Sequence, residues 1–382
     1  MRSVSVIGIG IIPFGKHVSE TVVQLGRQAA LNALMDTGIK PAELGIGFFS
    51  NCFGARLFGE FTVGQNVLWE VGINKIPIIN VENACTSGSS AFHLAWLSIA
   101  SGLYDTAIVV GAEKLYVPEI GLLNSGETQW DTRLGFVVPA GFAMRAKRHM
   151  HDYGTTPEQL AYVAVKNRMH GSLNPISQFK DPITIDDVLN SPMICDPLTR
   201  LSSCPIGDGA AALVLCASSR ARRYTRKPIR IKSSVLVTGS YGNPIQLIPW
   251  ETDVRGCQAA YESAGLGPDD IDLAECHDAF TIAEVLHYEA MGFCPQGEGG
   301  RLAISGATSL GGKHPVNVSG GLLSKGHPLG ATGIAQILEI VLHLRGQAGQ
   351  RQVKGAKVGL AHCMGGDKDG DGKTCTVNIL SL

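Results

Sequence analysis

The strongest constraint on the fold of this chain is an internal repeat. A helical pattern of apolar residues at 20–37 stops at Gly38, and a second helical pattern at 254–264 stops at Gly265. After each glycine comes the same kind of turn, which contains a proline and an acidic residue ahead of a new apolar segment. The chain is therefore predicted to fold as two halves that are built alike.

The repeat extends to a second helix in each half. A helix of small and apolar residues that follows Cys85 leads to a strand at 106–111, and a helix that follows His327 leads to a strand at 357–361. Strands that alternate with helices predict parallel sheets covered by helices on both faces. We predict an α/β fold of two stacked halves, in which the helix starts at Cys85 and His327 meet near a pseudo-two-fold axis.

The length of 382 residues also favours two halves, because single cores rarely grow so large. We place the boundary between residues 1–224 and 225–382. The first half is longer because residues 115–203 contain polar turns and one good helix at 156–170, which is typical of a lid or binding excursion. The basic stretch 218–228 at the junction is interpreted as a solvated linker rather than a phosphate-binding patch.

Composition excludes several classes of function. The net charge of −1 offers no footprint for nucleic acid or an anionic membrane, and no apolar run is long enough to span a bilayer. The ten cysteines are scattered and include no C-x-x-C pair, which favours reduced thiols in a cytoplasmic protein and argues against a structural zinc site in this chain. A charged fraction of only 17% predicts that part of the apolar surface is buried in a subunit interface.

Four reactive side chains lie on glycine-flanked or strand-end turns: Cys85, His277, His327 and Cys363. Cys85 sits where an apolar segment gives way to a helix, and a helix N-terminus favours a thiolate over a thiol. Each residue alone has an ordinary structural explanation, since free cysteines are often small core residues. Their coincidence at matching points of a duplicated chain points instead to a catalytic site.

These residues lie in motifs that resemble those of the thiolase family, in the branch of the thiolase domain of sterol carrier protein. The motifs are Asn83-Ala84-Cys85-Thr86-Ser87-Gly88, His277-Asp278-Ala279-Phe280, Gly326-His327-Pro328-Leu329-Gly330-Ala331-Thr332-Gly333 and Cys363-Met364-Gly365. Most thiolases have Asn-Glu where this chain has His277-Asp278, and that difference indicates the branch. The resemblance covers essentially the whole chain and implies the five-layered α-β-α-β-α thiolase fold.

The resemblance also implies a role for each residue. Cys85 attacks a 3-oxoacyl-CoA and becomes acylated, His327 takes the thiol proton, and Cys363 moves the α-proton. The backbone N–H groups of Cys85 and Gly365 are expected to hold the acyl-enzyme oxyanion, while His327 and His277 hold the thioester oxygen, the latter through water. Coenzyme A is then a substrate, and no metal is expected in this chain.

Three other functions fit the same architecture less well. A decarboxylating condensing enzyme would not need Cys363, and a retro-aldolase that cleaves steroid side-chain CoA esters would not need Cys85. A non-catalytic lipid carrier would need none of the four residues. The acidic run at 367–372 copies half of a calcium loop, but Asn378 stands where a bidentate Glu is required, so a polar hairpin turn between the last two strands is predicted.

The resemblance suggests partners as well. We expect a homodimer, to which members of this branch often add a small subunit with a zinc finger and an OB fold. The most specific resemblance is to the large subunit of benzoylsuccinyl-CoA thiolases from anaerobic toluene degradation, which favours benzoylsuccinyl-CoA as the substrate.

Overall fold

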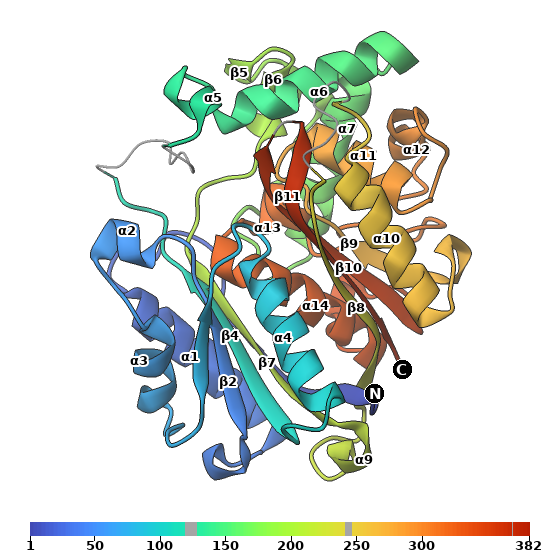
Figure 1. Ribbon diagram of the computed structural model, residues 1–382. Coiled ribbons are helices and arrows are strands. Elements are labelled where there is room, and N and C mark those ends of the chain that lie inside the picture. Colours follow the sequence, from blue (N-terminus) through green and yellow to red (C-terminus); the bar gives the residue numbers. More distant parts are fainter. Residues whose placement is uncertain (119–127, 241–246, 369) are drawn as a thin grey trace.

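A mixed sheet runs through the centre of the protein in the computed structural model, which describes residues 1–118, 128–240, 247–368 and 370–382 (Figure 1). Within these residues, nine strands form the sheet in the order β3-β2-β4-β7-β1-β8-β11-β10-β9. The strands are β1 (Val4–Ile11), β2 (Ile46–Ser50), β3 (Ile78–Val81), β4 (Thr106–Glu113), β7 (Gly209–Ala217), β8 (Ile229–Thr238), β9 (Leu273–Glu275), β10 (Val358–Lys368) and β11 (Asp371–Ser381). A separate pair joins β5 (Met193–Cys195) to β6 (Leu198–Thr199).

Helices cover both faces of the sheet and fill the space between its halves. They are α1 (Val22–Thr37), α2 (Gly54–Phe58), α3 (Val63–Glu70), α4 (Ser87–Ala100), α5 (Trp130–Arg133), α6 (Val138–Tyr153), α7 (Pro157–Ser172), α8 (Ile185–Leu189), α9 (Ser218–Ala221), α10 (Glu251–Ala264), α11 (Thr281–Ala290), α12 (Gly299–Ile304), α13 (Gly321–Lys325) and α14 (Leu329–Arg345). Short 3₁₀ turns lie at η1 (Pro41–Glu43), η2 (Arg200–Ser202), η3 (Pro268–Asp270) and η4 (Gly349–Arg351).

The structure confirms the repeat. Helices α1 and α10 both end at a glycine in the left-handed conformation, Gly38 with φ 68° and Gly265 with φ 66°, and a 3₁₀ turn follows each. In the described sheet the strands β2-β4-β7-β1 of the first half correspond to β9-β10-β11-β8 of the second, and β3 is an additional edge strand of the first half. The halves join where Val6 of β1 pairs with Ile229 of β8.

The prediction of parallel sheets was wrong, because the sheet is mixed. β2 runs parallel to β3 and β4, and β9 runs parallel to β10, whereas β1, β7, β8 and β11 form antiparallel pairs. The chain leaves β4 at Glu113 and returns into β7 at Gly209 directly opposite, so β7 must run antiparallel. β10 and β11 form the predicted hairpin, with Lys368 opposite Asp371; residue 369 lies outside the described residues.

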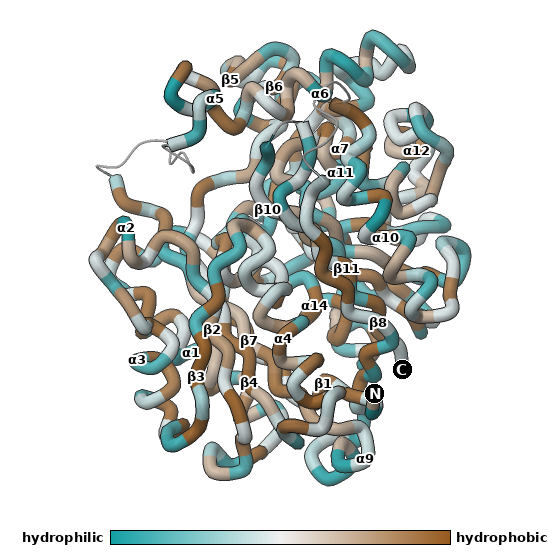
Figure 2. The backbone as a smooth tube through the Cα atoms, in the orientation of Figure 1, coloured by the Kyte–Doolittle hydropathy of each residue, from teal (hydrophilic) through white to brown (hydrophobic). Residues whose placement is uncertain are grey.

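The five-layered arrangement is present. α4 and α14 contact each other and pack between the two halves of the sheet, while α1 covers the outer face of one half and α10 that of the other (Figure 1). Along β7, Leu213 and Leu215 join the core around α4 and α14, whereas Ala212 and Val214 join the core under α1. Strand β7 is therefore apolar on both faces, and hydrophobic colour follows β2 and β4 in Figure 2.

The excursion at 115–203 contains more helix than predicted. The predicted helix is present as α7, which begins after the N-cap residue Thr156, but α6 was missed. The sequence of α6 contains Pro139, which is tolerated in the first turn of a helix, and its apolar face is narrow. Residues 119–127 of the excursion lie outside the described part of the chain, and no described helix is long and apolar enough to cross a membrane.

Candidate active site

Cys85 lies on a tight turn that connects β3 to α4. The residue before it, Ala84, has a φ of 49°, a left-handed backbone conformation that residues other than glycine rarely adopt. The hydroxyl of Ser87 stabilises this turn, because it accepts a hydrogen bond from the Asn83 N–H at 2.7 Å and donates one to the Ala84 carbonyl at 2.6 Å. The strained turn holds the Cys85 thiol at the junction of the two halves.

His327 is the partner of Cys85. Its Nε2 atom lies 3.3 Å from the Cys85 Sγ, and its Nδ1 lies 2.8 Å from the Oγ1 of Thr332. The Thr332 hydroxyl donates its hydrogen to the Pro328 carbonyl at 3.0 Å, so it accepts from Nδ1–H. The Nε2 of neutral His327 is therefore unprotonated and able to accept the thiol proton.

Burial keeps both members of this pair neutral. It raises the pKa of Cys85 to about 12, although the backbone N–H groups of Gly366 and of Cys85 itself act in the opposite direction. Burial likewise lowers the pKa of His327 to about 3. The backbone N–H groups at this turn therefore favour the thiolate, but desolvation outweighs them and the pKa of Cys85 is raised.

His277 lies between β9 and α11, beside His327. The two rings meet edge to face with centroids 5.1 Å apart. The His277 Nε2 is buried and has no hydrogen-bond partner among the described residues. Burial, reinforced by His327, lowers the pKa of His277 well below its usual value. A neutral ring with an unpartnered nitrogen beside the nucleophile is suited to binding a substrate oxygen or a water.

Cys363 lies on β10, where its thiol donates to the carbonyl oxygen of Cys85 at 3.2 Å. Burial, followed by the nearby Cys85, raises the pKa of Cys363 well above its usual value. Cys363 is thus a protonated thiol that lies next to Cys85. The structure therefore brings together all four side chains that the sequence singled out.

The glycine pair after Cys363 lies against the nucleophile turn. A methyl group on Gly365 would lie only 3.0 Å from the Asn83 carbonyl oxygen and 3.1 Å from the Cys85 nitrogen. The next residue, Gly366, directs its N–H towards the Cys85 sulfur and has a φ of 65°. Sequence reasoning missed Gly366, although a second glycine so close to Cys363 was a usable signal.

Glu113 and Asp278 connect the elements that carry the site, a role that sequence reasoning did not predict for either residue. Glu113 at the end of β4 accepts hydrogen bonds from Cys52 N–H and from Gly330 N–H, both at 2.9 Å, and so ties the first half to the start of α14. Burial raises the pKa of Glu113 to about 7. Asp278, beside His277, accepts from the Leu322 N–H at 2.7 Å and so anchors α13, which precedes His327.

Two groups of side chains bring possible metal-binding atoms within 4.8 Å of one another: Cys85, His277 and His327; and Asp253, His362 and Cys375. In each group a hydrogen-bond contact already joins two members, at 3.3 Å between Cys85 and His327 and at 2.9 Å between Asp253 and His362. We therefore interpret both groups as hydrogen-bonded networks.

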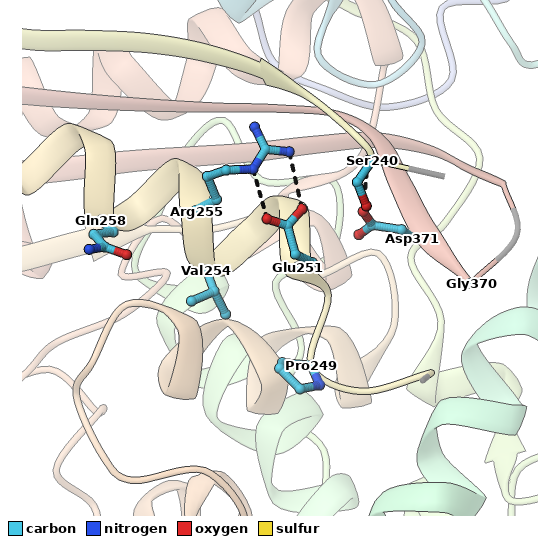
Figure 3. A pocket seen from close by; sticks show the side chains of 8 residues that line it. All are labelled: Ser240, Pro249, Glu251, Val254, Arg255, Gln258, Gly370 and Asp371. Carbon is cyan, nitrogen blue, oxygen red and sulfur yellow. Dashed lines mark hydrogen bonds and ion pairs between the residues drawn. The ribbon is translucent and has the colours of Figure 1, made fainter. Parts of the chain in front are cut away.

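A cavity of about 320 Å³ opens near the start of α10 (Figure 3). None of the four reactive residues lines it. Its charged side chains already have partners, since Arg255 pairs with Glu251 at 2.8 Å and Asp371 accepts from Ser240 N–H and from Thr252 Oγ1. This cavity therefore does not identify a binding site for coenzyme A.

Both halves of the chain match family descriptions. Residues 4–219 match "Thiolase, N-terminal domain" and residues 250–372 match "Thiolase C-terminal domain-like". The chain is 39% identical to an acetyl-CoA acetyltransferase from Methanothermobacter thermautotrophicus, over all of both proteins. It is 39% identical to benzoylsuccinyl-CoA thiolase subunit BbsB from Thauera aromatica, over 96% of this chain and 95% of that protein. It is 37% identical to human sterol carrier protein 2, over 96% of this chain and 70% of that protein.

Solved structures share the fold. The Ltp2-ChsH2(DUF35) aldolase superimposes with a TM-score of 0.86 at 26% identity and covers 100% of this chain and 98% of its own. Human mitochondrial 3-ketoacyl-CoA thiolase superimposes with a TM-score of 0.78 at 19% identity, with the same coverage.

Proposed function

Because the chain belongs to the thiolase family and is a CoA-dependent acyltransferase, we propose that it cleaves a 3-oxoacyl-CoA through an acyl group carried on Cys85. The observation that carries this proposal is the hydrogen bond between Cys85 Sγ and the unprotonated Nε2 of His327. A thiol and a base held in this geometry are what nucleophilic attack on a carbonyl requires.

In the first half-reaction, His327 takes the proton from the Cys85 thiol while the sulfur attacks the 3-keto carbon. The bond between C2 and C3 breaks, which leaves the acyl group on Cys85 and releases the enolate of the CoA thioester. Cys363 donates its proton to the enolate carbon and becomes a thiolate. We assign the stabilisation of the enolate oxygen, directly or through a water, to His277, and its unpartnered Nε2 supports this assignment.

In the second half-reaction, the Cys363 thiolate takes the proton from the thiol of free coenzyme A. The resulting CoA thiolate attacks the acyl carbon, and Cys85 leaves and recovers its proton from His327. Two oxyanions arise on the acyl carbon during these steps, and the N–H groups of Cys85 and Gly365 are proposed to hold them. The closeness of Gly365 to the Cys85 nitrogen supports this assignment.

For the substrate, we propose benzoylsuccinyl-CoA, with acetoacetyl-CoA as the alternative. The relatives support both choices, because BbsB and the acetyl-CoA acetyltransferase are equally identical to this chain. The test compares turnover of acetoacetyl-CoA, a long-chain 3-oxoacyl-CoA and benzoylsuccinyl-CoA by the purified chain. Efficient use of acetoacetyl-CoA alone would overturn the benzoylsuccinyl assignment.

The aldolase among the structural relatives supports a second candidate, a retro-aldol cleavage of a CoA ester. A retro-aldol reaction forms no acyl-enzyme and consumes no coenzyme A, so Cys85 and His327 would have no task in it. Product analysis separates the two functions, because a thiolase consumes one coenzyme A per cleavage and releases no free aldehyde or ketone. We favour the thiolase because the Cys85–His327 pair is intact.

We also propose that the chain forms a homodimer. β3 is an edge strand of the sheet, and its apolar side chain Ile79 is 43% exposed. Edge strands and apolar surface of this kind are usually covered by a second chain. Light scattering after size-exclusion chromatography should give about twice the chain mass of 40.4 kDa. A mass equal to that of one chain would contradict the dimer.

A small zinc-finger and OB-fold subunit is a further proposed partner. The aldolase relative carries DUF35 in its name, which is compatible with a second protein on this fold. Co-expression with a neighbouring small reading frame, followed by metal analysis of the purified complex, tests this partner. Failure to isolate a stable complex would leave a homodimer without it.

A further inference from the structure

A network of three buried residues contacts the backbone carbonyl of His277. Asp253 on α10, His287 on α11 and His362 on β10 each expose at most 1% of the side chain. The Asp253 Oδ2 lies 2.6 Å from the His287 Nδ1, and its Oδ1 lies 2.9 Å from the His362 Nε2. The His287 Nε2 lies 3.0 Å from the carbonyl oxygen of His277.

The partners of His287 define its protonation. A backbone carbonyl can only accept, so Nε2 must carry a hydrogen that it donates to His277. The hydrogen bond between Nδ1 and the Asp253 carboxyl requires a second hydrogen. The pair of Asp253 and His287 thus holds two hydrogens, one on Nε2 and one between Nδ1 and the Asp253 carboxyl.

His343 is a second buried histidine, and its hydrogen-bond partners differ from those of His287. His343 also contacts a carboxylate, with its Nε2 3.2 Å from the Glu339 Oε1. Its Nδ1, however, accepts a hydrogen bond from the Val353 N–H at 3.0 Å, so that nitrogen carries no hydrogen. His343 is a singly protonated buried histidine, whereas His287 faces acceptors on both sides.

The surroundings of the network favour the charged form of the pair. Burial acts to raise the pKa of Asp253, but His362 and His287 outweigh it and hold the pKa below its usual range. Trp250 stacks on the His287 ring with centroids 5.5 Å apart, and the thiols of Cys257 and Cys375 lie beside Asp253 and His362. No other acidic side chain in the described residues is hydrogen-bonded to His287.

We propose that Asp253 and His287 form a buried carboxylate–imidazolium pair that positions His277 by donating a hydrogen bond to its backbone carbonyl. This inference rests on the proposed role of His277 as an oxyanion donor. Among the described residues the Nε2 of His277 has no hydrogen-bond partner, so the bond to its backbone carbonyl helps to hold this residue in place. The pair holds the His277 carbonyl from one side, and the bonds of Asp278 to α13 hold the following residue from the other.

The charge of the pair has a second effect on His277. His287 acts to lower the pKa of His277, after the larger effects of burial and of His327, whereas Asp253 acts in the opposite direction. The lowered pKa of His277 favours a neutral ring. Asp253 and His287 are positioning residues, because neither contacts the reacting atoms.

The protonation of His287 is tested directly on the wild-type enzyme with ¹⁵N-labelled histidine. Both ring nitrogens of His287 should give protonated signals from about pH 6 to about pH 9. The signals are assigned by their loss in His287→Gln. A signal from an unprotonated nitrogen of His287 in that range would overturn the inference, whatever the activity of the enzyme.

The positioning role is tested by a double-mutant cycle on turnover. Asp253→Asn should lower kcat about tenfold in the wild-type background, with the KM for the CoA ester unchanged, but only about twofold or less in the His277→Ala background. Equal losses in the two backgrounds would show that Asp253 does not act through His277. If the wild-type enzyme shows no thiolase turnover, the proposed function fails instead, and the ¹⁵N measurement still decides the pair.

A matched control separates positioning from loss of stability. His343→Gln breaks a comparable buried histidine–carboxylate contact on α14, so it should lower the melting temperature while leaving kcat unchanged. A fall in kcat for His343→Gln equal to that for Asp253→Asn would overturn the proposal. So would one tightly bound zinc per chain that Asp253→Asn removes, because Asp253 would then be a metal ligand.

Discussion

The Sγ of Cys85 and the Nε2 of His327 lie 3.3 Å apart, although 242 positions separate the two residues in the sequence. Each residue lies at the start of the central helix of its own half, α4 or α14, and those helices pack against each other. The duplicated fold thus brings a nucleophile from one half to a base from the other.

Replacing Cys85 with serine or alanine should abolish turnover while largely preserving affinity for CoA esters. The thiol is needed for chemistry rather than for binding. In the wild-type protein, incubation with substrate in the absence of free coenzyme A should leave an acyl group on Cys85 that mass spectrometry of peptides can locate. An acyl group found on another cysteine would mean that the nucleophile has been misassigned.

Cys363→Ala should separate the two half-reactions. Exchange of the α-protons of acetyl-CoA with solvent should be lost, because the only group assigned to that proton is gone. Transfer of an acyl group from Cys85 to a small thiol should be much less affected, since other bases, including solvent, can deprotonate the acceptor. Equal loss of both activities would contradict the assignment.

His277 should behave as a hydrogen-bond donor. His277→Asn keeps a donor at the site and should retain substantial activity, whereas His277→Ala should lower kcat by on the order of a hundredfold. Steady-state kinetics of the two variants decides the question. If the asparagine variant is as inactive as the alanine variant, hydrogen-bond donation does not explain the role of His277.

The rate at which Cys85 is alkylated should rise with pH, because the pKa of Cys85 is raised. With the pKa of Cys85 near 12 and that of His327 near 3, the resting pair is neutral, so the thiolate fraction grows with every rise in pH. The rate of Cys85 alkylation by iodoacetamide, followed by mass spectrometry, should keep rising up to about pH 10. A rate that is already constant below about pH 7 would indicate a resting thiolate–imidazolium pair.

The contact between the central helices should be intolerant of added volume. A methyl group on Gly333 of α14 would lie 2.6 Å from the Ser89 nitrogen of α4, so Gly333→Ala should destabilise the protein by about 2 kcal/mol. Urea denaturation measures the change, and Gly15→Ala, with no atom within 4 Å of the new methyl group, is the control. Equal stability of the two variants would show that the helices can move apart.

The sequence by itself determined the repeat, the positions of α1, α4, α7, α10 and α14, and the four reactive side chains. Local patterns were sufficient there, because helical periodicity, the capping residue Thr156 and the stop glycines Gly38 and Gly265 act over a few neighbouring residues. The motif around Cys85 is likewise contiguous in the chain.

Only the tertiary structure decided the strand directions, the protonation of Cys85 and the contacts around His277. Strand pairing depends on where a long excursion returns to the sheet, and no local pattern around Glu113 and Gly209 encodes that. The pKa of Cys85 depends on burial by residues from both halves, which outweighs the local effect of the helix start. Asp253, His287 and His362 come from three separate elements, so only folding could reveal that they meet behind His277.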